Sequence, residues 1–234
     1  MASMFELLME LPLFRGVSRS RMAEIVGTAK FHFLKFPVGE TIIRAGDDSS
    51  HLTFVISGSV RATTANDSGR FAVSQTLEAP AVIAPDFLFG RVTRYPATVM
   101  ALTDCSILKI SKADYVRILY SDEVFMFNYL NTLSVNAQKA LDGILSLTSG
   151  GIDERIAFWI ACLTQPGSKD ISMSCRTRDL CNLFSVPRNV FEAATAEMER
   201  HGLIRYTPRS IDIIDRKAML SLLDRQSESH EDQP

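Results

Sequence analysis

The sequence predicts an α+β protein: a barrel or sandwich of short strands, then a long helix, then a small winged helix-turn-helix domain. Three observations support this prediction. Residues 31–110 are rich in β-branched and aromatic residues and are divided by Gly-containing turns. Residues 121–148 carry an apolar repeat at helical spacing. Residues 177–203 have the pattern of two short helices joined by a tight turn.

The composition is that of an ordinary globular chain. Its 234 residues are 46% hydrophobic and 22% charged, and because the net charge is −2, any nucleic-acid contact must come from a local basic patch. Residues 1–10 lack the basic segment of a signal peptide, and no apolar run approaches the roughly 18 residues that span a bilayer. We therefore expect a cytoplasmic protein with no metal site and no resident cofactor. Its four scattered thiols are expected to be buried or free: Cys105, Cys162, Cys175 and Cys181.

Residues 1–30 are expected to be helical, with Ser18 or Ser20 as a helix cap. The apolar positions of this segment are Leu11, Phe14, Met22, Ile25 and Val26. Strands begin at residue 31, with turns at Gly39, Gly46, Gly58 and Gly69. Residues 111–114, Ser-Lys-Ala-Asp, have the form of a capping box with Asp in place of Glu and predict the start of the next helix.

A long helix is predicted from residue 121 to residue 148, with acidic residues Asp122 and Glu123 at its positive end. Apolar residues recur along it at alternating spacings of four and three: Met126, Leu130, Leu133, Ala137, Ala140, Ile144 and Leu147. Such a seam fits either a helix docked on its own barrel or a two-stranded dimer helix, and the spacing alone favours neither. The segment Ser149-Gly150-Gly151 is a candidate hinge.

The helix-turn-helix is predicted within a domain of residues 149–223, and the wholly non-apolar residues 224–234 are expected to be disordered. Thr177 is the expected cap of the first helix, and Pro187 suits the first turn of the second. The expected inward residues are Leu180, Leu183, Phe184, Val186, Phe191, Ala194 and Met198. Gly202 ends the second helix, and residues 203–205 and 211–214 form a hairpin, the wing, around a tip at 206–210.

The outward residues of this motif predict DNA binding. Arg188 and Asn189 stand at the start of the second helix, where Arg recognises guanine and Asn recognises adenine through paired hydrogen bonds. Glu192, one turn further on, completes the expected base-reading set. The expected phosphate contacts are Arg176, Thr177, Arg178, Arg205 and Arg209. Taken singly, each arginine fits an ordinary solvated surface equally well, and Glu192, Glu197 and Glu199 weaken the basic patch.

Several segments in one order resemble the Crp/Fnr family of bacterial transcription regulators. They are residues 36–40, 43–46, 54–60, 95–99 and 155–157. The resemblance implies a cyclic-nucleotide-binding-type sensor domain at 1–120, built as a double-stranded β-helix or jelly-roll barrel, a dimerisation helix at 121–148 and a winged helix-turn-helix at 149–223. It also favours the dimer interpretation of the long helix.

The resemblance does not extend to the nucleotide-binding residues. Where nucleotide-binding members have a Gly-Glu pair and an Arg, this chain has Pro85-Asp86 and Tyr95. Pro85 has no N–H to offer a phosphate and Tyr95 carries no charge, while Arg94 is expected to face away from the pocket. We therefore expect no binding of cyclic AMP, and an effector that the sequence does not identify. The expected effector pocket, open to an apolar ligand or filled by its own side chains, is Asp86, Phe87, Leu88, Arg94, Tyr95, Ala97 and Thr98.

The DNA end of the resemblance also departs from the family pattern. Asn189 stands in place of the usual Glu, Ala193 in place of a frequent Arg, and Ser185 in place of the usual turn Gly, where a left-handed residue costs about 1 kcal/mol. The expected function is a dimeric regulator of a near-palindromic operator in double-stranded DNA, with RNA polymerase as a second candidate partner. Two alternatives are a regulatory module that binds no DNA and a metal-dependent barrel enzyme. The enzyme is disfavoured because His32 and His51 are isolated in the sequence.

Overall fold

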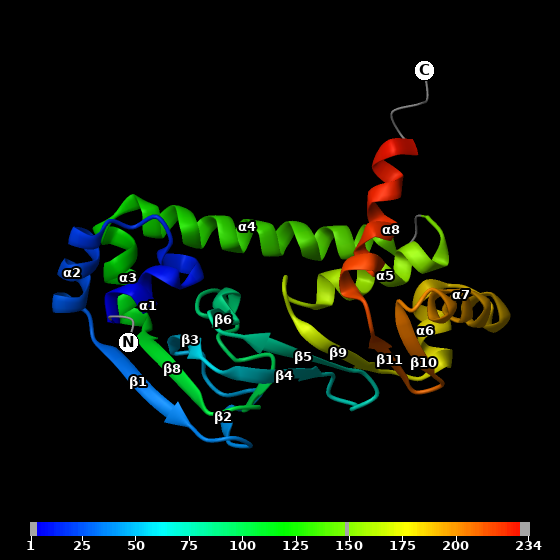
Figure 1. Ribbon diagram of the computed structural model, residues 1–234, viewed down its shortest axis with the longest axis horizontal. Helices are drawn as coiled ribbons and strands as arrows, with labels where there is room; N and C mark the ends of the chain where they lie inside the picture. The colour runs from blue at the N-terminus through cyan, green and yellow to red at the C-terminus, as the bar shows by residue number, and fades with distance from the viewer. Residues whose placement is uncertain (1–3, 148–149, 230–234) are drawn as a thin grey trace. The chain divides into compact units, whose positions relative to one another are not determined.

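The computed structural model of the chain describes residues 4–147 and 150–229 (Figure 1). The chain divides into two compact units. We call residues 1–62 with 77–136 the barrel unit, and residues 63–76 with 137–234 the head unit. The domain boundaries expected from the sequence are continuous, whereas residues 63–76 group with the head unit.

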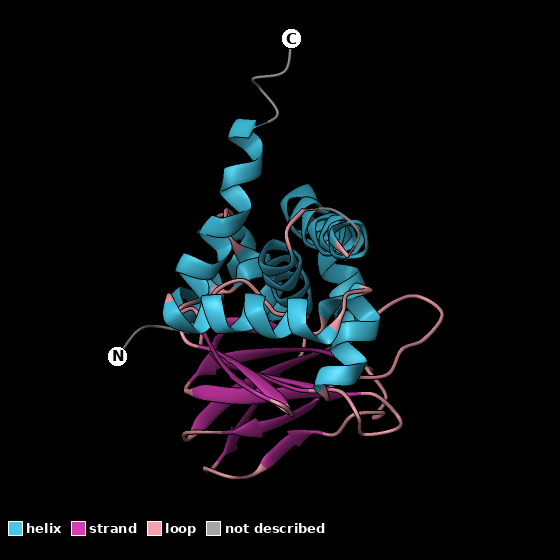
Figure 2. Cartoon of the chain, turned by 90° about the vertical axis from the view of Figure 1, so that its right-hand side faces the viewer, coloured by secondary structure: helices cyan, strands magenta, loops and turns pink. Residues whose placement is uncertain are grey.

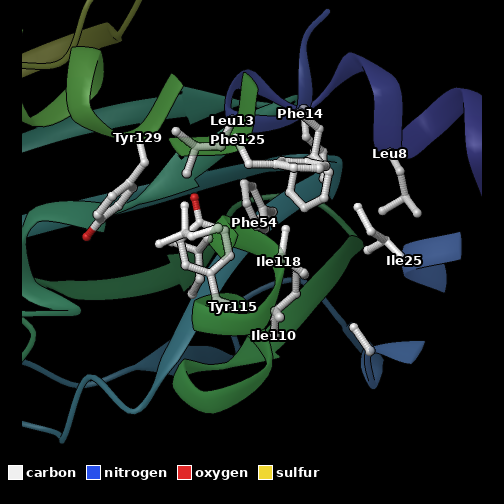
Figure 3. Close-up of a cluster of buried hydrophobic side chains, with 14 of the residues drawn as sticks. Leu8, Leu13, Phe14, Ile25, Phe54, Ile110, Tyr115, Ile118, Phe125 and Tyr129 are labelled. Carbon is white, nitrogen blue, oxygen red and sulfur yellow. The ribbon is translucent and has the colours of Figure 1, made fainter. Parts of the chain in front are cut away.

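The barrel unit begins with helices α1 (Met4–Glu10), η1 (Pro12–Phe14) and α2 (Arg19–Thr28). Ser18 is the N-cap of α2, and its Oγ accepts a hydrogen bond from the Arg21 N–H at 3.3 Å. Figure 3 shows the aromatic side chains that these helices cover. The Phe14 ring lies edge-on to Phe54 at 5.6 Å and to Phe125 at 5.3 Å, so apolar burial holds helices and strands together.

The strands are antiparallel, as the alternation of β-formers and turns predicts. They are β1 (Phe31–Phe36), β2 (Thr41–Ile43), β3 (His51–Ser57), β4 (Ser59–Ala65), β5 (Ala72–Glu78), β6 (Ala81–Ile83), β7 (Thr98–Ala101) and β8 (Cys105–Ser111). One sheet has the order β1-β8-β3-β6, and β2 pairs with β7 in the other. The side chains between them form a second apolar core that includes Val55, Val60, Val99 and Ile107.

Helix α3 (Lys112–Ser121) starts at the capping box that the sequence predicts. Ser111 Oγ accepts from the Asp114 N–H at 3.1 Å and donates to the Asp114 carboxylate at 2.6 Å. The shorter Asp side chain therefore bonds to the capping hydroxyl, where a Glu would reach back to the backbone of the cap residue.

Helix α4 (Glu123–Ser146) presents a different apolar row from the predicted seam. Met126 and Leu133 pack against the barrel core beside the buried Phe125 and Tyr129, and Leu147 packs against the head core. The exposed side chains at heptad spacing are Phe127, Leu130, Ser134, Ala137, Leu141 and Ile144. This row shares Leu130, Ala137 and Ile144 with the predicted seam, whose Ala140 is also exposed.

The head unit contains α5 (Ile152–Leu163), β9 (Lys169–Ser174), α6 (Thr177–Phe184), α7 (Arg188–Arg200), β10 (Ile204–Thr207), β11 (Ser210–Ile213) and α8 (Arg216–Ser229). Strand β9 pairs with β11 on one side and with β5 on the other. Helix α8 continues to Ser229 (Figure 2), so residues 224–229 are helical where the sequence predicts disorder. Arg225, Gln226 and Glu228 have good helix propensity, so the local sequence is compatible with a helix over these residues. The rest of the predicted tail, 230–234, and Ser149 of the predicted hinge lie outside the described residues.

Candidate nucleic-acid interface

Helix α6 is anchored by four buried side chains on one face: Thr177, Leu180, Cys181 and Phe184. Leu183, which the sequence places on this face, is instead 39% exposed. At about 100° per residue, positions 181 and 183 lie equally far from the centre of the face that Leu180 and Phe184 define, and the buried Thr177 shifts that face toward 181. Leucine and cysteine are both apolar, so hydrophobicity alone does not predict that Cys181 is buried and Leu183 exposed.

The turn after α6 is held from both sides. Ser185 adopts the left-handed conformation with φ of 54°, as the sequence predicts, and its N–H bonds to the Asn182 carbonyl at 3.3 Å. From α5, the Arg155 guanidinium donates to the Phe184 carbonyl and lies over the Phe184 ring at 5.7 Å. Arg155 therefore fixes the end of α6, a role that its place in the sequence alone does not reveal.

Helix α7 is fixed in the head by Phe191, Thr195 and Met198, all buried. The Phe191 ring stacks on Phe184 at 6.3 Å and meets the Tyr206 ring edge-on at 5.9 Å. Thr195, fully buried, takes the central place that the sequence assigns to the half-buried Ala194. Its hydroxyl donates to the Phe191 carbonyl at 3.0 Å, which removes the cost of burying a polar group.

The outward start of α7 carries the predicted base-reading side chains. Arg188 and Asn189 are exposed, directly after the N-cap Pro187. Arg188 Nε donates to the Glu192 carboxylate at 2.7 Å, and this hydrogen bond raises the pKa of the already cationic guanidinium. The structure thus brings Arg188 and Glu192 together along one helix face. If Arg188 contacts a base through Nε, it must first break this ion pair. The pair is exposed and therefore weak, so breaking it costs little.

The wing is tied to both helices of the motif. The Thr177 hydroxyl lies 2.5 Å from the Tyr206 hydroxyl and bonds to the Pro208 carbonyl at 3.2 Å. The Glu199 carboxylate accepts from the Tyr206 N–H at 2.7 Å. Thr177 is therefore buried and occupied within the head rather than available to a phosphate, and the cap of α6 is Arg176.

The other predicted phosphate contacts are all exposed: Arg176, Arg178, Arg205 and Arg209. Arg178 lies 3.8 Å from the Asp179 carboxylate. Arg176 and Arg209 lie close to one another along the backbone ladder, because the Cys175 N–H bonds to the Arg209 carbonyl at 2.9 Å. A patch of arginines therefore flanks the exposed start of α6 and the wing tip, with Asp179 as its nearest described carboxylate partner.

The predicted effector residues are engaged in the barrel unit itself. Tyr95 is buried, and its hydroxyl donates to the His51 carbonyl at 2.8 Å and lies 3.0 Å from the Thr53 hydroxyl. The Asp86 carboxylate accepts from Asn136 of α4 at 2.6 Å. Arg94 is exposed and donates to the Gly46 carbonyl at 2.9 Å, which agrees with its predicted outward direction.

The remaining effector residues do not gather around one space. Leu88 is buried in the core of α1, α2 and α3, whereas Tyr95 is buried in the core between the sheets. Phe87 and Ala97 are half-buried, and Thr98 accepts a hydrogen bond from the Ala45 N–H. A shallow pocket elsewhere in the barrel unit is lined by Ile25, Thr28, Ala29, Arg117, Ile118 and Ser121.

Among the described helices, none is long and apolar enough to cross a membrane. Within those same residues, no three His, Cys, Asp or Glu side chains are grouped as metal ligands.

Part of the chain matches a known domain family. Residues 33–122 match the family described as Cyclic nucleotide-binding domain. The cAMP-activated global transcriptional regulator of Haemophilus influenzae is 32% identical over 97 residues, which are 41% of this chain and 43% of that regulator. A voltage-gated inwardly rectifying potassium channel of Rattus norvegicus is 30% identical over 149 residues, 60% of this chain and 14% of the channel. The matches therefore span less than half the length of these relatives.

One solved structure shares the fold over nearly all of both chains. The catabolite activator protein of Thermus thermophilus covers 92% of this chain and 99% of its own, with a TM-score of 0.51 and 19% identity. At this identity the likeness shows the fold alone. It confirms the predicted α+β class, with an antiparallel barrel-like domain followed by C-terminal helices.

Proposed function

We propose that this chain, which carries a cyclic nucleotide-binding domain and has the fold of the Crp/Fnr regulators, is a sequence-specific DNA-binding transcription regulator. One observation carries the proposal: α7 begins with the exposed Arg188 and Asn189 and is fixed by buried side chains beside a wing. A rigid helix that offers an Arg and an Asn at its free end suits the edges of guanine and adenine in the major groove. The arginines around the wing supply phosphate contacts.

The functional form is proposed to be a homodimer. The row Phe127, Leu130, Ala137, Leu141 and Ile144 leaves apolar side chains exposed along α4 at the spacing of a two-stranded coiled coil. Ser134 and Ala137 are small and permit close approach of a second helix. A two-fold dimer presents two α7 helices, which matches a near-palindromic operator. Location in the cytoplasm and contact with RNA polymerase belong to the same proposal.

The barrel is proposed not to use cyclic AMP. Pro85 offers no N–H, and its carbonyl accepts from the Tyr129 hydroxyl at 2.9 Å. Tyr95, at the position where the resemblance expects the phosphate-binding Arg, is hydrogen-bonded inside the barrel. An anionic phosphate would find no cation there, because Arg94 is bonded to Gly46 on the outside.

A mobility-shift assay with fragments of genomic DNA at two salt concentrations tests the proposal. We expect retarded bands for the unmodified protein. Arg188→Ala should lower the affinity for the bound fragments roughly 10- to 100-fold. Arg200→Ala is the matched control, since Arg200 is as exposed as Arg188 but pairs with Glu197 at the other end of α7. Equal loss for both variants, or no retarded fragment at either salt concentration, would reject the DNA-reading role.

The potassium-channel relative favours one second candidate, a regulatory module that acts on a protein partner. The same assay separates the two functions, because a protein-binding module retards no DNA fragment. We assign the chain no catalytic step.

A further inference from the structure

The hairpin of β4 and β5 is built into the head unit at its tip, residues 63–76. Val73 is only 4% exposed and belongs to the head core. The Phe71 ring lies 5.3 Å from Trp159 of α5, and the Gln75 side chain accepts from the Gln165 N–H at 2.8 Å. The hairpin tip is therefore a structural part of the head, with its own share of the core.

The strand register places this tip at the same end of the sheet as the wing tip. Ser174 of β9 pairs with Ala72 of β5 on one side and with Ser210 of β11 on the other. Arg70 lies two residues beyond Ala72, and Arg176 lies two residues beyond Ser174 in the same direction. At about 3.3 Å per residue, both lie within about 7 Å of the last paired residues along the strand direction. Arg70 thus stands beside the arginine patch of the wing.

The turn holds the backbone at Arg70 in place. The Asn66 side-chain oxygen accepts from the Arg70 N–H at 3.1 Å and from the Phe71 N–H at 3.2 Å. The Asn66 N–H bonds to the Phe71 carbonyl at 3.0 Å and closes the loop. The Arg70 side chain is exposed, and its guanidinium has no hydrogen-bond or ion-pair partner in the part of the chain that the structure describes. Only Asp67 opposes its charge within the turn, residues 66–70.

We propose that the β4–β5 turn acts as a second wing, in which Arg70 binds a backbone phosphate of the duplex that α7 reads. This inference rests on the proposed function. Arg70, Arg176, Arg178 and Arg209 outnumber the nearby Asp67 and Asp179, so the surface complements a polyanion. A phosphate contact adds affinity for every DNA sequence and fixes the position of the head on the duplex.

The test compares Arg70→Ala with Arg70→Lys in the full-length protein. The probes are a duplex that the unmodified protein enriches from a random library and a scrambled duplex of equal length. We expect Arg70→Ala to weaken binding two- to tenfold on both probes and to reduce the steepness of the salt dependence by about 0.9 in log–log slope. Arg70→Lys is expected to keep the slope, because the charge remains. Arg61→Ala is the control, since Arg61 is exposed on β4 within the barrel unit.

The outcomes are distinguishable from failure of the proposed function. If Arg188→Ala loses the enriched duplex while Arg70→Ala binds with unchanged affinity and slope, the second wing is rejected and the DNA-reading role stands. An equal loss for Arg61→Ala and Arg70→Ala also rejects it, because the effect is then one of overall charge. If the unmodified protein binds neither probe, both proposals fail. Thermal melting of each variant checks the fold, and a lowered melting temperature for Arg70→Ala would assign the residue a structural role instead.

Discussion

Ser185 shows how one residue limits the stability of the helix-turn-helix. Its φ of 54° lies in the left-handed region, where a side chain with a Cβ is strained by about 1 kcal/mol. Its backbone N–H bonds to the Asn182 carbonyl, as any residue here could, whereas its side chain is exposed and adds no bond to a described residue.

Replacing Ser185 with Gly should stabilise the protein by roughly 0.5–1 kcal/mol, because glycine adopts this conformation without a Cβ clash. Chemical denaturation of the two proteins measures the difference in free energy of unfolding. Ser185→Ala is the control, since it keeps the Cβ and should bring no gain. A Gly variant less stable than the Ala variant would show that the left-handed strain is not what limits this turn.

Spacing in the sequence predicts some buried residues of the helix-turn-helix and not others. Phe191 and Met198 were predicted as anchors of α7 from their spacing alone, and they are buried. Thr195 and Thr177 were not predicted to be buried, because each depends on a hydrogen-bond partner that sequence does not specify, the Phe191 carbonyl and Tyr206. The pairing of Arg188 with Glu192 is predictable from their i, i+4 spacing, and it engages two residues that the sequence also predicts to contact DNA.

At the scale of elements, the start of α3 depends on a buried carboxylate. Asp114 accepts from the Ser111 hydroxyl, which lowers the pKa of the carboxyl, and Arg117 lowers it further against the opposing effect of burial. Because the pKa of Asp114 is lower in the folded protein than in the unfolded chain, the ionised carboxylate stabilises the fold at pH values above the ordinary pKa of Asp. This stabilisation is lost as the pH falls through the lowered pKa.

Asp114→Asn should therefore lower the melting temperature at neutral pH, and the difference from the unmodified protein should shrink as the pH falls below about 4. Melting curves between neutral and acidic pH provide the measurement. Asp67→Asn, at an exposed turn, serves as the comparison and should change stability little at neutral pH. A difference that grows toward acidic pH would contradict the assigned role of the Asp114 charge.

The exposed row of α4 makes a separate prediction at this scale. Ile144→Lys should raise the dissociation constant of the dimer at least tenfold, because a charge would enter an apolar helix pair. Analytical ultracentrifugation across protein concentrations measures it. Asn131→Lys adds the same charge at an exposed position outside the row and should leave the dimer intact. An unmodified protein that sediments as a monomer would contradict the dimer proposal directly.

Two residues of the predicted seam, Met126 and Leu133, pack against the barrel core, and the reason can be stated. A long helix that packs on its own barrel and also exposes an apolar face has two apolar stripes, and a heptad count over the sequence merges them. The stripe that faces the barrel is identified by its contact with the barrel core, to which Phe125 and Tyr129 belong. The existence of the helix follows from local sequence alone: the prediction covers residues 121–148, and α4 covers Glu123–Ser146.

At the scale of the whole molecule, the order of barrel, long helix and winged helix-turn-helix was predictable from periodicity and turn residues. The placement of residues 63–76 in the head unit was not. It depends on pairing between β5 and β9, which are about a hundred residues apart in the sequence, as Ala72 and Ser174 show. Local sequence patterns do not specify which distant strands pair, so they predict domains only as continuous segments of the chain.

The barrel unit is predicted not to bind cyclic AMP. A ligand that binds only the folded protein, at 100 times its dissociation constant, adds about 2.7 kcal/mol of stability. We expect no rise in melting temperature at millimolar cyclic AMP, because Tyr95 is uncharged and hydrogen-bonded to His51, and Pro85 has no N–H to donate to a phosphate. A rise that grows with ligand concentration would overturn this part of the account.

If paired α7 helices read DNA through their exposed starts, the duplexes that the protein enriches from a random library will carry the sequence they read, and sequencing these duplexes reveals it. Two α7 helices related by a two-fold axis should enrich an inverted repeat whose half-site centres lie about 10 base pairs apart, or a multiple of that spacing, and Arg188 should select a guanine within it. The guanine in each half-site should lose its enrichment with Arg188→Ala and keep it with Arg200→Ala. A library that shows no enriched sequence, or a motif unchanged by Arg188→Ala, would contradict this role of α7.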